Sequence, residues 1–136
     1  MLHKSLIASS AVVLWLSAAP AVAGVCLGKS MTLDEIIDAI NSTPGCERAM
    51  TLFESCEYGT GGDLHPGAAV EKKCERDFLG RLGVPEKRVY QRKMRLCDRK
   101  YQNESGTMYL SFTAFCRAKV AQRYSRQSRK TSGSSR

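Results

Sequence analysis

Six cysteines are the side chains of this 136-residue chain with the clearest chemical use. Neighbouring cysteines stand ten or more residues apart, and no C-x-x-C pair occurs. Zinc sites use closely spaced cysteine pairs, whereas an even number of dispersed cysteines in a short exported chain is typical of disulfides. We therefore expect no metal site and three disulfides, with the pairing left open, among Cys26, Cys46, Cys56, Cys74, Cys97 and Cys116.

Catalytic groups are few in this sequence. A Ser/His/Asp or Cys/His arrangement would depend on His65, whose position before Pro66 indicates a loop. The glycine-rich stretch 58–63 lacks the Lys-Ser/Thr of a phosphate-binding loop, so we expect a flexible connector there. We expect neither an enzyme nor a cofactor. Paired carboxylates of the glycosidase type stay open as an alternative, with Glu54, Glu57, Asp63, Glu71 and Glu75 as the candidate residues.

The charge changes sign along the chain. Lys and Arg number 21 against 13 Asp and Glu, which gives a net charge of +8. Residues 24–84 carry 6 basic and 10 acidic side chains (net −4), and residues 85–136 carry 14 basic and 3 acidic ones (net +11). This asymmetry predicts a basic face that attracts anions. Its expected members are Arg88, Arg92, Arg95 and Arg99, followed in the C-terminal segment by Arg117, Lys119, Arg123, Arg126, Arg129 and Lys130.

The first four of these arginines recur at helical spacing, opposite an apolar stripe of the same helix. Candidate partners are lipopolysaccharide or teichoic phosphates, anionic lipid headgroups, acidic glycans, extracellular nucleic acid or an acidic protein. The plainer interpretation is that arginine supplies the solvated face that any surface helix needs. We see no large apolar residues interleaved with the basic ones, so we expect surface attraction rather than insertion into lipid.

Helical periodicity runs through the chain, and no sustained alternation of β-branched residues occurs. Thr32 and Glu35 have the spacing of a capping box, which predicts the start of a first helix. The sequence thus predicts an all-α fold, a small disulfide-stapled bundle of four to five short helices. The expected helices cover about residues 32–41, 46–57, 67–83 and 85–101, and a fifth begins at about 107.

Apolar stripes at helical spacing define the expected core-facing side of the last three helices. The sets are Val70, Cys74, Phe78 and Leu82, then Tyr90, Met94, Cys97 and Tyr101, and finally Tyr109, Phe112, Cys116 and Val120.

The N-terminus has the form of a secretory signal peptide. Lys4 precedes the apolar run 6–16, and cleavage is expected after Ala23. The run is shorter than the roughly 20 apolar residues of a membrane span, although an uncleaved anchor and lipoprotein attachment at Cys26 remain alternatives. We therefore expect a periplasmic or secreted protein with one domain over residues 24–124. Residues 125–136 are polar and Ser-rich, which predicts a disordered basic tail.

The stretch from Val84 to Ser125 resembles the C-terminal half of the LprI-like family of small exported bacterial proteins. The features that carry the resemblance are a basic helix ending in Arg95-Leu96-Cys97-Asp98-Arg99, then Ser105-Gly106-Thr107-Met108-Tyr109, then Phe115-Cys116-Arg117-Ala118-Lys119. The family is named for a lysozyme inhibitor and is otherwise largely a domain of unknown function. The resemblance implies that Cys97 and Cys116 pair and close the last two helices into a hairpin.

Two functions follow as hypotheses. The resemblance implies an exported interaction protein of the bacterial envelope, with inhibition of lysozyme or another muramidase as the activity to test. Because animal lysozymes are basic, the acidic half would have to make that contact, through Glu54, Glu57 and Asp63. The charge asymmetry instead predicts a binder of anionic envelope polymers or lipids that uses Arg88, Arg92, Arg95 and Arg99.

Overall fold

The computed structural model describes Cys26 and residues 31–134, and this part of the chain folds into five α-helices without a strand. The helices are α1 (Leu33–Ser42), α2 (Cys46–Ser55), α3 (Leu64–Glu75), α4 (Val84–Lys100) and α5 (Met108–Gly133), with a 3-10 turn at Leu79–Arg81. The expected all-α, disulfide-stapled bundle is confirmed. No helix in these ranges is long and apolar enough to cross a bilayer. The expected signal peptide, residues 1–23, lies outside the described residues.

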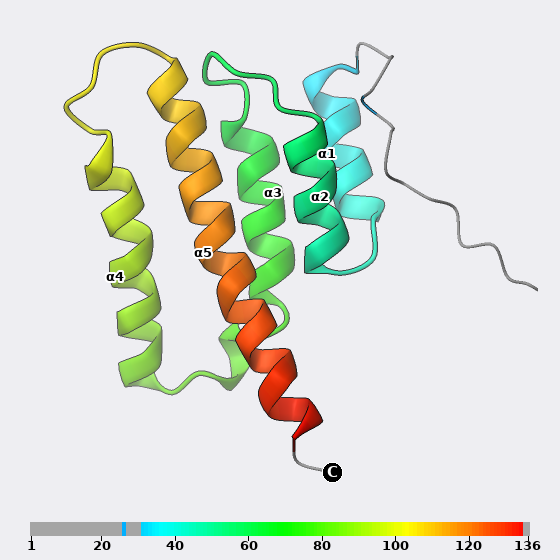
Figure 1. Ribbon diagram of the computed structural model, residues 1–136, viewed down its shortest axis with the longest axis vertical. Coiled ribbons are helices and arrows are strands. Elements are labelled where there is room, and N and C mark those ends of the chain that lie inside the picture. The colour runs from blue at the N-terminus through cyan, green and yellow to red at the C-terminus, as the bar shows by residue number, and fades with distance from the viewer. Residues whose placement is uncertain (1–25, 27–30, 135–136) are drawn as a thin grey trace, which may run out of the picture.

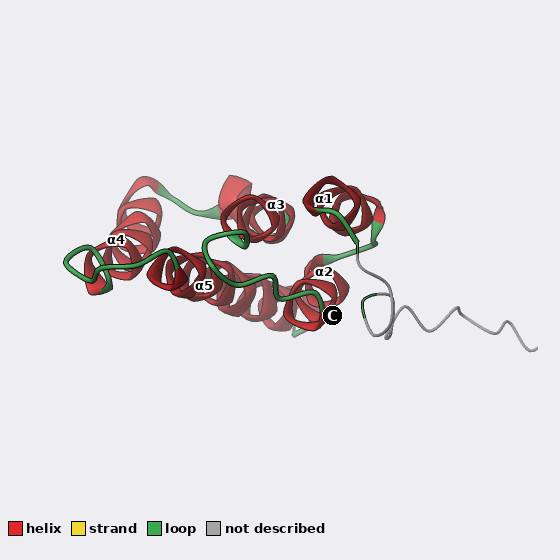
Figure 2. Cartoon of the chain, turned by 90° about the horizontal axis from the view of Figure 1, so that it is seen from above, coloured by secondary structure: helices red, strands yellow, loops and turns green. Residues whose placement is uncertain are grey.

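The helices form two layers with α4 at one end (Figures 1 and 2). Helix α3 packs against α1, α2 and α5, and α2 also contacts α1 and α5. Seen from above, α1 and α3 make one row and α2 and α5 the other. Helix α4 packs against α5 at the edge of this arrangement, on the side away from α1. One long flank of α4 is therefore open to solvent.

The first helix begins as its sequence predicts. The Thr32 hydroxyl accepts the Glu35 N–H at 3.3 Å, and the Glu35 carboxylate accepts the Thr32 N–H at 2.8 Å, which completes the capping box. At the other end of α1, Lys73 of α3 donates to the Asn41 carbonyl at 2.9 Å and also to the Thr43 carbonyl. A cation suits the last carbonyls of a helix, so this contact fixes α1 on α3.

The third helix begins and ends earlier in the chain than its apolar spacing predicts, and it is shorter. It begins at Leu64, so His65 lies in its first turn rather than in a loop, and it ends at Glu75. The chain then turns through the 3-10 segment, and Phe78 leaves the line of Val70. Phe78 instead packs in a second core cluster with Tyr90, whose ring centre lies 5.1 Å away. A continuous helix would have kept both residues on one stripe.

Small residues on α5 face α3 at a close helix contact. The sequence predicts a buried stripe of large residues there, and of these Val120 is buried whereas Phe112 is exposed. The other buried residues of α5 are small, namely Ser111, Ala114, Ala118, Ala121 and Ser125. These short side chains let α3 approach closely. A Cβ on Gly67 of α3 would lie 2.9 Å from the Ala114 Cβ, closer than two carbon atoms can pack.

All six cysteines form disulfides, namely Cys26–Cys56, Cys46–Cys74 and Cys97–Cys116, with Cα–Cα distances of 5.2, 4.6 and 5.6 Å. The first two bridges interleave in sequence and lock α2 to the segment before α1 and to the end of α3. The third joins α4 to α5, which is the pairing that the family resemblance implies.

The expectation of disorder from Ser125 onward is wrong, because α5 continues to Gly133. Ser125 is fully buried and donates to the Asp77 carboxylate, while the Ser128 hydroxyl donates to the Asp77 carbonyl at 3.0 Å. Near the end of the helix, Arg81 donates to the Ser132 hydroxyl at 2.8 Å. These polar contacts to the turn after α3 hold a segment that lacks the aliphatic residues of a core-facing helix. Residues 135–136 lie outside the described residues.

Candidate functional site

Helix α4 presents four arginines to solvent. Gly83 and Pro85 start the helix, and its buried stripe of Tyr90, Met94 and Cys97 fixes its rotation against α5. The arginines recur four, three and four residues apart on the side away from that stripe. They are the predicted anion-binding residues, and all of them are exposed: Arg88, Arg92, Arg95 and Arg99.

None of these four arginines forms an ion pair with a carboxylate in residues 31–134. Acidic residues are scarce on α4 itself. Asp98 is held by Arg117 of α5, and Glu86 lies at the start of the helix next to Gly83. The arginine surface, defined as Arg88, Arg92, Arg95 and Arg99, therefore carries four guanidinium groups that no carboxylate of the described residues pairs with.

The cations of α5 behave differently, which corrects the predicted basic face. Arg117 pairs with Glu71 and Asp98, and Lys119 lies 3.8 Å from Glu54. Arg126 and Arg129 both pair with Glu47 of α2, at 2.7 and 2.8 Å. The carboxylates of the acidic half thus neutralise much of α5. Of the α5 residues in the predicted face, two remain exposed without an ion pair inside the described ranges, Arg123 and Lys130.

Glu47 is the centre of the pairing on α2. Arg126 donates to both of its carboxylate oxygens at 2.7 Å, and Gln122 donates to one of them at 2.8 Å. The hydrogen bonds from Arg126, Arg129 and Gln122 outweigh partial burial and lower the pKa of Glu47 from 4.5 to about 2. This carboxylate is therefore ionised and committed to structure at neutral pH.

The predicted contact residues for an inhibitor do not form one acidic surface. Asp63 is fully buried, because its carboxylate accepts the N–H groups of Tyr58 and Gly59 at 2.7 and 2.8 Å and closes the glycine-rich turn. It cannot touch a partner. The same turn is anchored by the hydrogen bond from the Gly61 N–H to Ser111, so it is no open connector. Glu54 and Glu57 are exposed.

Glu71 and Glu75 line a cavity of about 550 Å³ between α3 and α5. Glu71 is held by Arg117, whereas Glu75 accepts the Tyr90 hydroxyl at 2.8 Å. Burial raises the pKa of Glu75, against the hydrogen bond from Tyr90. One carboxylate is therefore tied to an arginine and the other to a phenol.

A third stripe on α4 was missed by the sequence reasoning. Val89, Lys93, Leu96 and Lys100 stand at the spacing of the arginines, on the flank next to α5, and Val89 and Leu96 are 40% and 55% exposed. The sequence contained the signal for this stripe, because its members recur four, three and four residues apart, as the arginines do, and the buried stripe of α4 has the same spacing. The predicted basic face did not include this flank, on which the exposed Val89 and Leu96 alternate with Lys93 and Lys100.

No family model, curated protein or solved structure matches this chain. The resemblance to the LprI-like family stays a prediction, and the functional conclusion depends on the geometry above.

Proposed function

We propose that this protein is an exported, disulfide-stabilised binder of anionic envelope polymers, and that the arginine surface of α4 makes the contact. The observation that carries the proposal is the contrast between the two basic helices. On α5 most cations are paired with carboxylates, whereas the four arginines of α4 are exposed and have no such partner in residues 31–134.

The chemistry of the surface suits phosphate, sulfate and carboxylate groups. Guanidinium binds such groups with two parallel hydrogen bonds, and it stays charged at any physiological pH. The four residues Arg88, Arg92, Arg95 and Arg99 span 12 residues of helix, and the 11 steps between the first and the last cover about 16 Å at about 1.5 Å per residue. A repeating polyanion is long enough to contact all of them, whereas a single small anion is not. Three disulfides suit an oxidising compartment, where envelope polymers are found.

Binding to heparin as a probe polyanion tests the proposal. If four charges are neutralised, raising the salt from 50 to 200 mM should weaken binding by about 50- to 150-fold. Replacing Arg88, Arg92, Arg95 and Arg99 by glutamine should abolish most of this salt dependence. Lipopolysaccharide and a teichoic polymer, measured in the same way, then identify the class of polymer.

The matched control removes the same charge elsewhere. Arg48→Gln, Lys72→Gln, Arg76→Gln and Lys130→Gln change exposed residues that lie outside the arginine surface. This variant should keep most of the affinity. Equal losses in both variants would show that only net charge matters, and salt-independent binding would contradict the proposal.

Inhibition of lysozyme is the second candidate and comes from the family resemblance. With Asp63 buried, an acidic contact would use Glu54 and Glu57, the first of which lies 3.8 Å from Lys119. A titration of purified protein against several lysozymes tests it. Inhibition that Glu57→Lys abolishes would support this function, and no inhibition at micromolar excess would eliminate it.

A further inference from the structure

A continuous groove runs between α4 and α5, on the flank of α4 next to its arginine surface. Three cavities of about 640, 350 and 600 Å³ follow one another along it. The first and second share Tyr124 and Gln127, and the second and third share Lys100, Cys116 and Arg123. The groove therefore follows the length of both helices.

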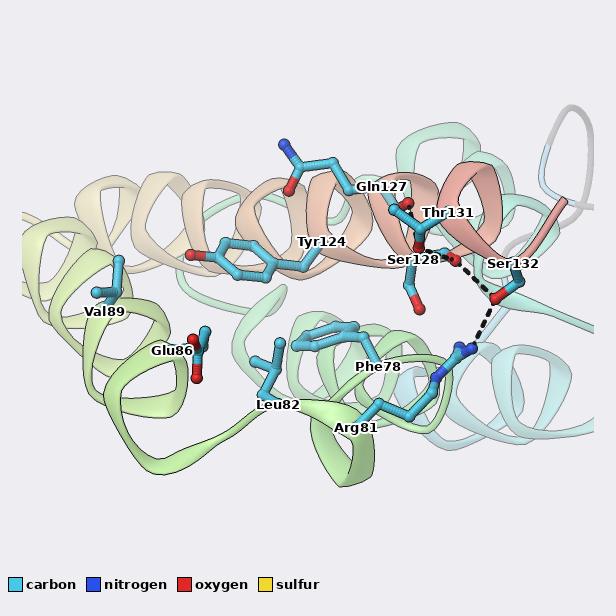
Figure 3. A pocket seen from close by; sticks show the side chains of 10 residues that line it. All are labelled: Phe78, Arg81, Leu82, Glu86, Val89, Tyr124, Gln127, Ser128, Thr131 and Ser132. Carbon is cyan, nitrogen blue, oxygen red and sulfur yellow. Dashed lines mark hydrogen bonds between the residues drawn. The ribbon is translucent and has the colours of Figure 1, made fainter. Parts of the chain in front are cut away.

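The first cavity is mainly apolar (Figure 3). Phe78 and Leu82, from the turn before α4, lie next to the Tyr124 ring of α5, and Val89 lies apart from them on α4, on the side of the Tyr124 hydroxyl. The hydrogen bond between Arg81 and Ser132 lies at the side away from Val89. This end of the groove therefore offers an apolar surface, and the hydrogen bond between Arg81 and Ser132 closes it on one side.

The middle cavity is cationic. Lys93, Lys100 and Arg123 line it together with Leu96, and none of the three cations pairs with a carboxylate in the described part of the chain. Lys93 lies 5.1 Å from the centre of the Tyr124 ring. Lys93 itself is exposed and Tyr124 is half-buried, so this cation–π contact is weak and the ammonium group remains available to an anion.

Carboxylates flank this middle cavity on both sides. Glu86 lines the apolar cavity, and Glu54 and Glu57 line the third. Arg81 also lines the first cavity, and Lys119 joins Lys100 and Arg123 in the third, so both ends carry charges of both signs. The middle cavity is lined by cations and by no carboxylate, so an anionic group is attracted there most strongly. The pattern along the groove is therefore an apolar section, then a cationic section, then a mixed section.

We infer that this groove binds one molecule of a single-chain amphiphile with an anionic headgroup. The acyl or alkyl chain lies against Phe78, Leu82, Val89 and Tyr124, and the headgroup binds among Lys93, Lys100 and Arg123. A hydrophilic polymer would leave the apolar cavity unused, and a neutral hydrocarbon would leave the three cations without a partner. The site is separate from the arginine surface and does not depend on the proposed function.

Calorimetric titration with monoalkyl phosphates of 6, 8, 10 and 12 carbons, each below its micelle concentration, tests the inference on the purified, disulfide-bonded protein. Affinity should increase by up to about fourfold per methylene. It should level off once the chain reaches the end of the apolar cavity. An alkylphosphocholine and an alkyl glucoside of equal chain length should bind at least about tenfold more weakly, because they lack net negative charge.

Two pairs of substitutions locate the site. Lys93→Gln with Arg123→Gln should weaken the decyl phosphate by about tenfold or more, since both are exposed residues of the groove. Arg88→Gln with Arg95→Gln removes the same charge from the other flank and should change the affinity by no more than about twofold. Val89→Gln should reduce the gain per methylene. Circular dichroism and the absence of free thiols establish that each variant is folded.

Several results would overturn the inference. The first two are affinities that do not depend on chain length and equal binding of phosphate and phosphocholine headgroups. The others are equal losses of affinity in the two double variants, or binding of the protein to anionic vesicles without binding to monomeric alkyl phosphate. The heparin measurement separates this site from the polymer site. If heparin binds as expected and no alkyl phosphate binds, the groove site alone is disproved. If alkyl phosphates bind and heparin does not, only the proposed polymer binding by the arginine surface is disproved.

Discussion

Arg117 of α5 holds Glu71 of α3 in a two-pronged ion pair, with Nε 3.0 Å from Oε2 and Nη2 2.8 Å from Oε1. The remaining nitrogen, Nη1, lies 2.9 Å from both carboxylate oxygens of Asp98 on α4. One guanidinium therefore joins three helices. These two carboxylates raise the pKa of Arg117 further above its ordinary value, so its charge is permanent.

Arg117→Gln should lower the free energy of unfolding by about 2 kcal/mol, since Glu71 is largely buried and would lose its partner. Arg117→Lys should recover less than half of that loss, because an ammonium group cannot bond both carboxylates through a planar fork. Urea unfolding followed by circular dichroism measures both values. Full recovery with lysine would show that charge alone, without the forked geometry, accounts for the contact.

Glu47 should make stability fall in acid. Its pKa is about 2 in the folded protein and 4.5 as an ordinary carboxyl, so its stabilising contribution is complete above about pH 4.5 and is lost as the pH falls toward 2. The pair is partly exposed, so Glu47→Gln should cost only about 1 kcal/mol at pH 7 and low salt. Unfolding curves from pH 7 to 2 should converge for the two proteins. A difference that persists at pH 2 would assign the effect to packing instead.

Glu75 should have the opposite effect on the pH profile. Burial raises its pKa, so the folded state binds a proton more readily than the unfolded state, and stability decreases as the pH rises from 4.5 through that raised pKa. Glu75→Gln keeps an acceptor for the Tyr90 hydroxyl and removes the buried charge. The variant should be as stable as the natural protein or more stable at pH 7, with a flatter profile above pH 4.5. Marked destabilisation at pH 7 would show that the ionised carboxylate is required.

Gly67→Ala should cost about 1–3 kcal/mol by overpacking the contact between α3 and α5. The new Cβ would lie 2.9 Å from the Ala114 Cβ and 3.2 Å from the Phe53 ring. Gly80→Ala is the matched control, because a Cβ there meets nothing within 4 Å. Thermal unfolding of the two variants gives the comparison. Equal melting temperatures for the two variants would mean that α3 and α5 can move apart to accept the new Cβ without loss of stability.

Features with a local cause were predictable from the sequence. The capping box at Thr32, the proline that starts α4 and the apolar stripe through Tyr90 each act within one turn or one helix. Their positions agree with the structure. The arginines of α4 follow from that stripe by geometry alone, since burying one side of a helix exposes the other.

Features that depend on partners from distant segments were not predictable. The end of α5 is helical because Ser125 contacts Asp77, a residue 48 positions earlier. The turn that buries Asp63 is anchored by the hydrogen bond from Gly61 to Ser111, 50 positions later. The small residues facing Gly67 carry little hydrophobic signal. The pairing of α5 cations with Glu47 likewise depends on how the helices pack. The net charge of a segment does not show which of its side chains meet carboxylates in the folded protein.

The arrangement of the disulfides divides the chain into two covalently closed units. One unit contains the interleaved bridges of Cys26, Cys46, Cys56 and Cys74, and the other is the hairpin closed by Cys97 and Cys116. The peptide between Cys74 and Cys97 is their single covalent connection, and it includes the exposed Arg81. A protease cut after Arg81 would therefore leave two pieces without a covalent link, held together by noncovalent contacts such as the packing and ion pairs of α5 on α2 and α3. Once denatured they would separate, and the hairpin that carries the arginine surface would keep its own crosslink.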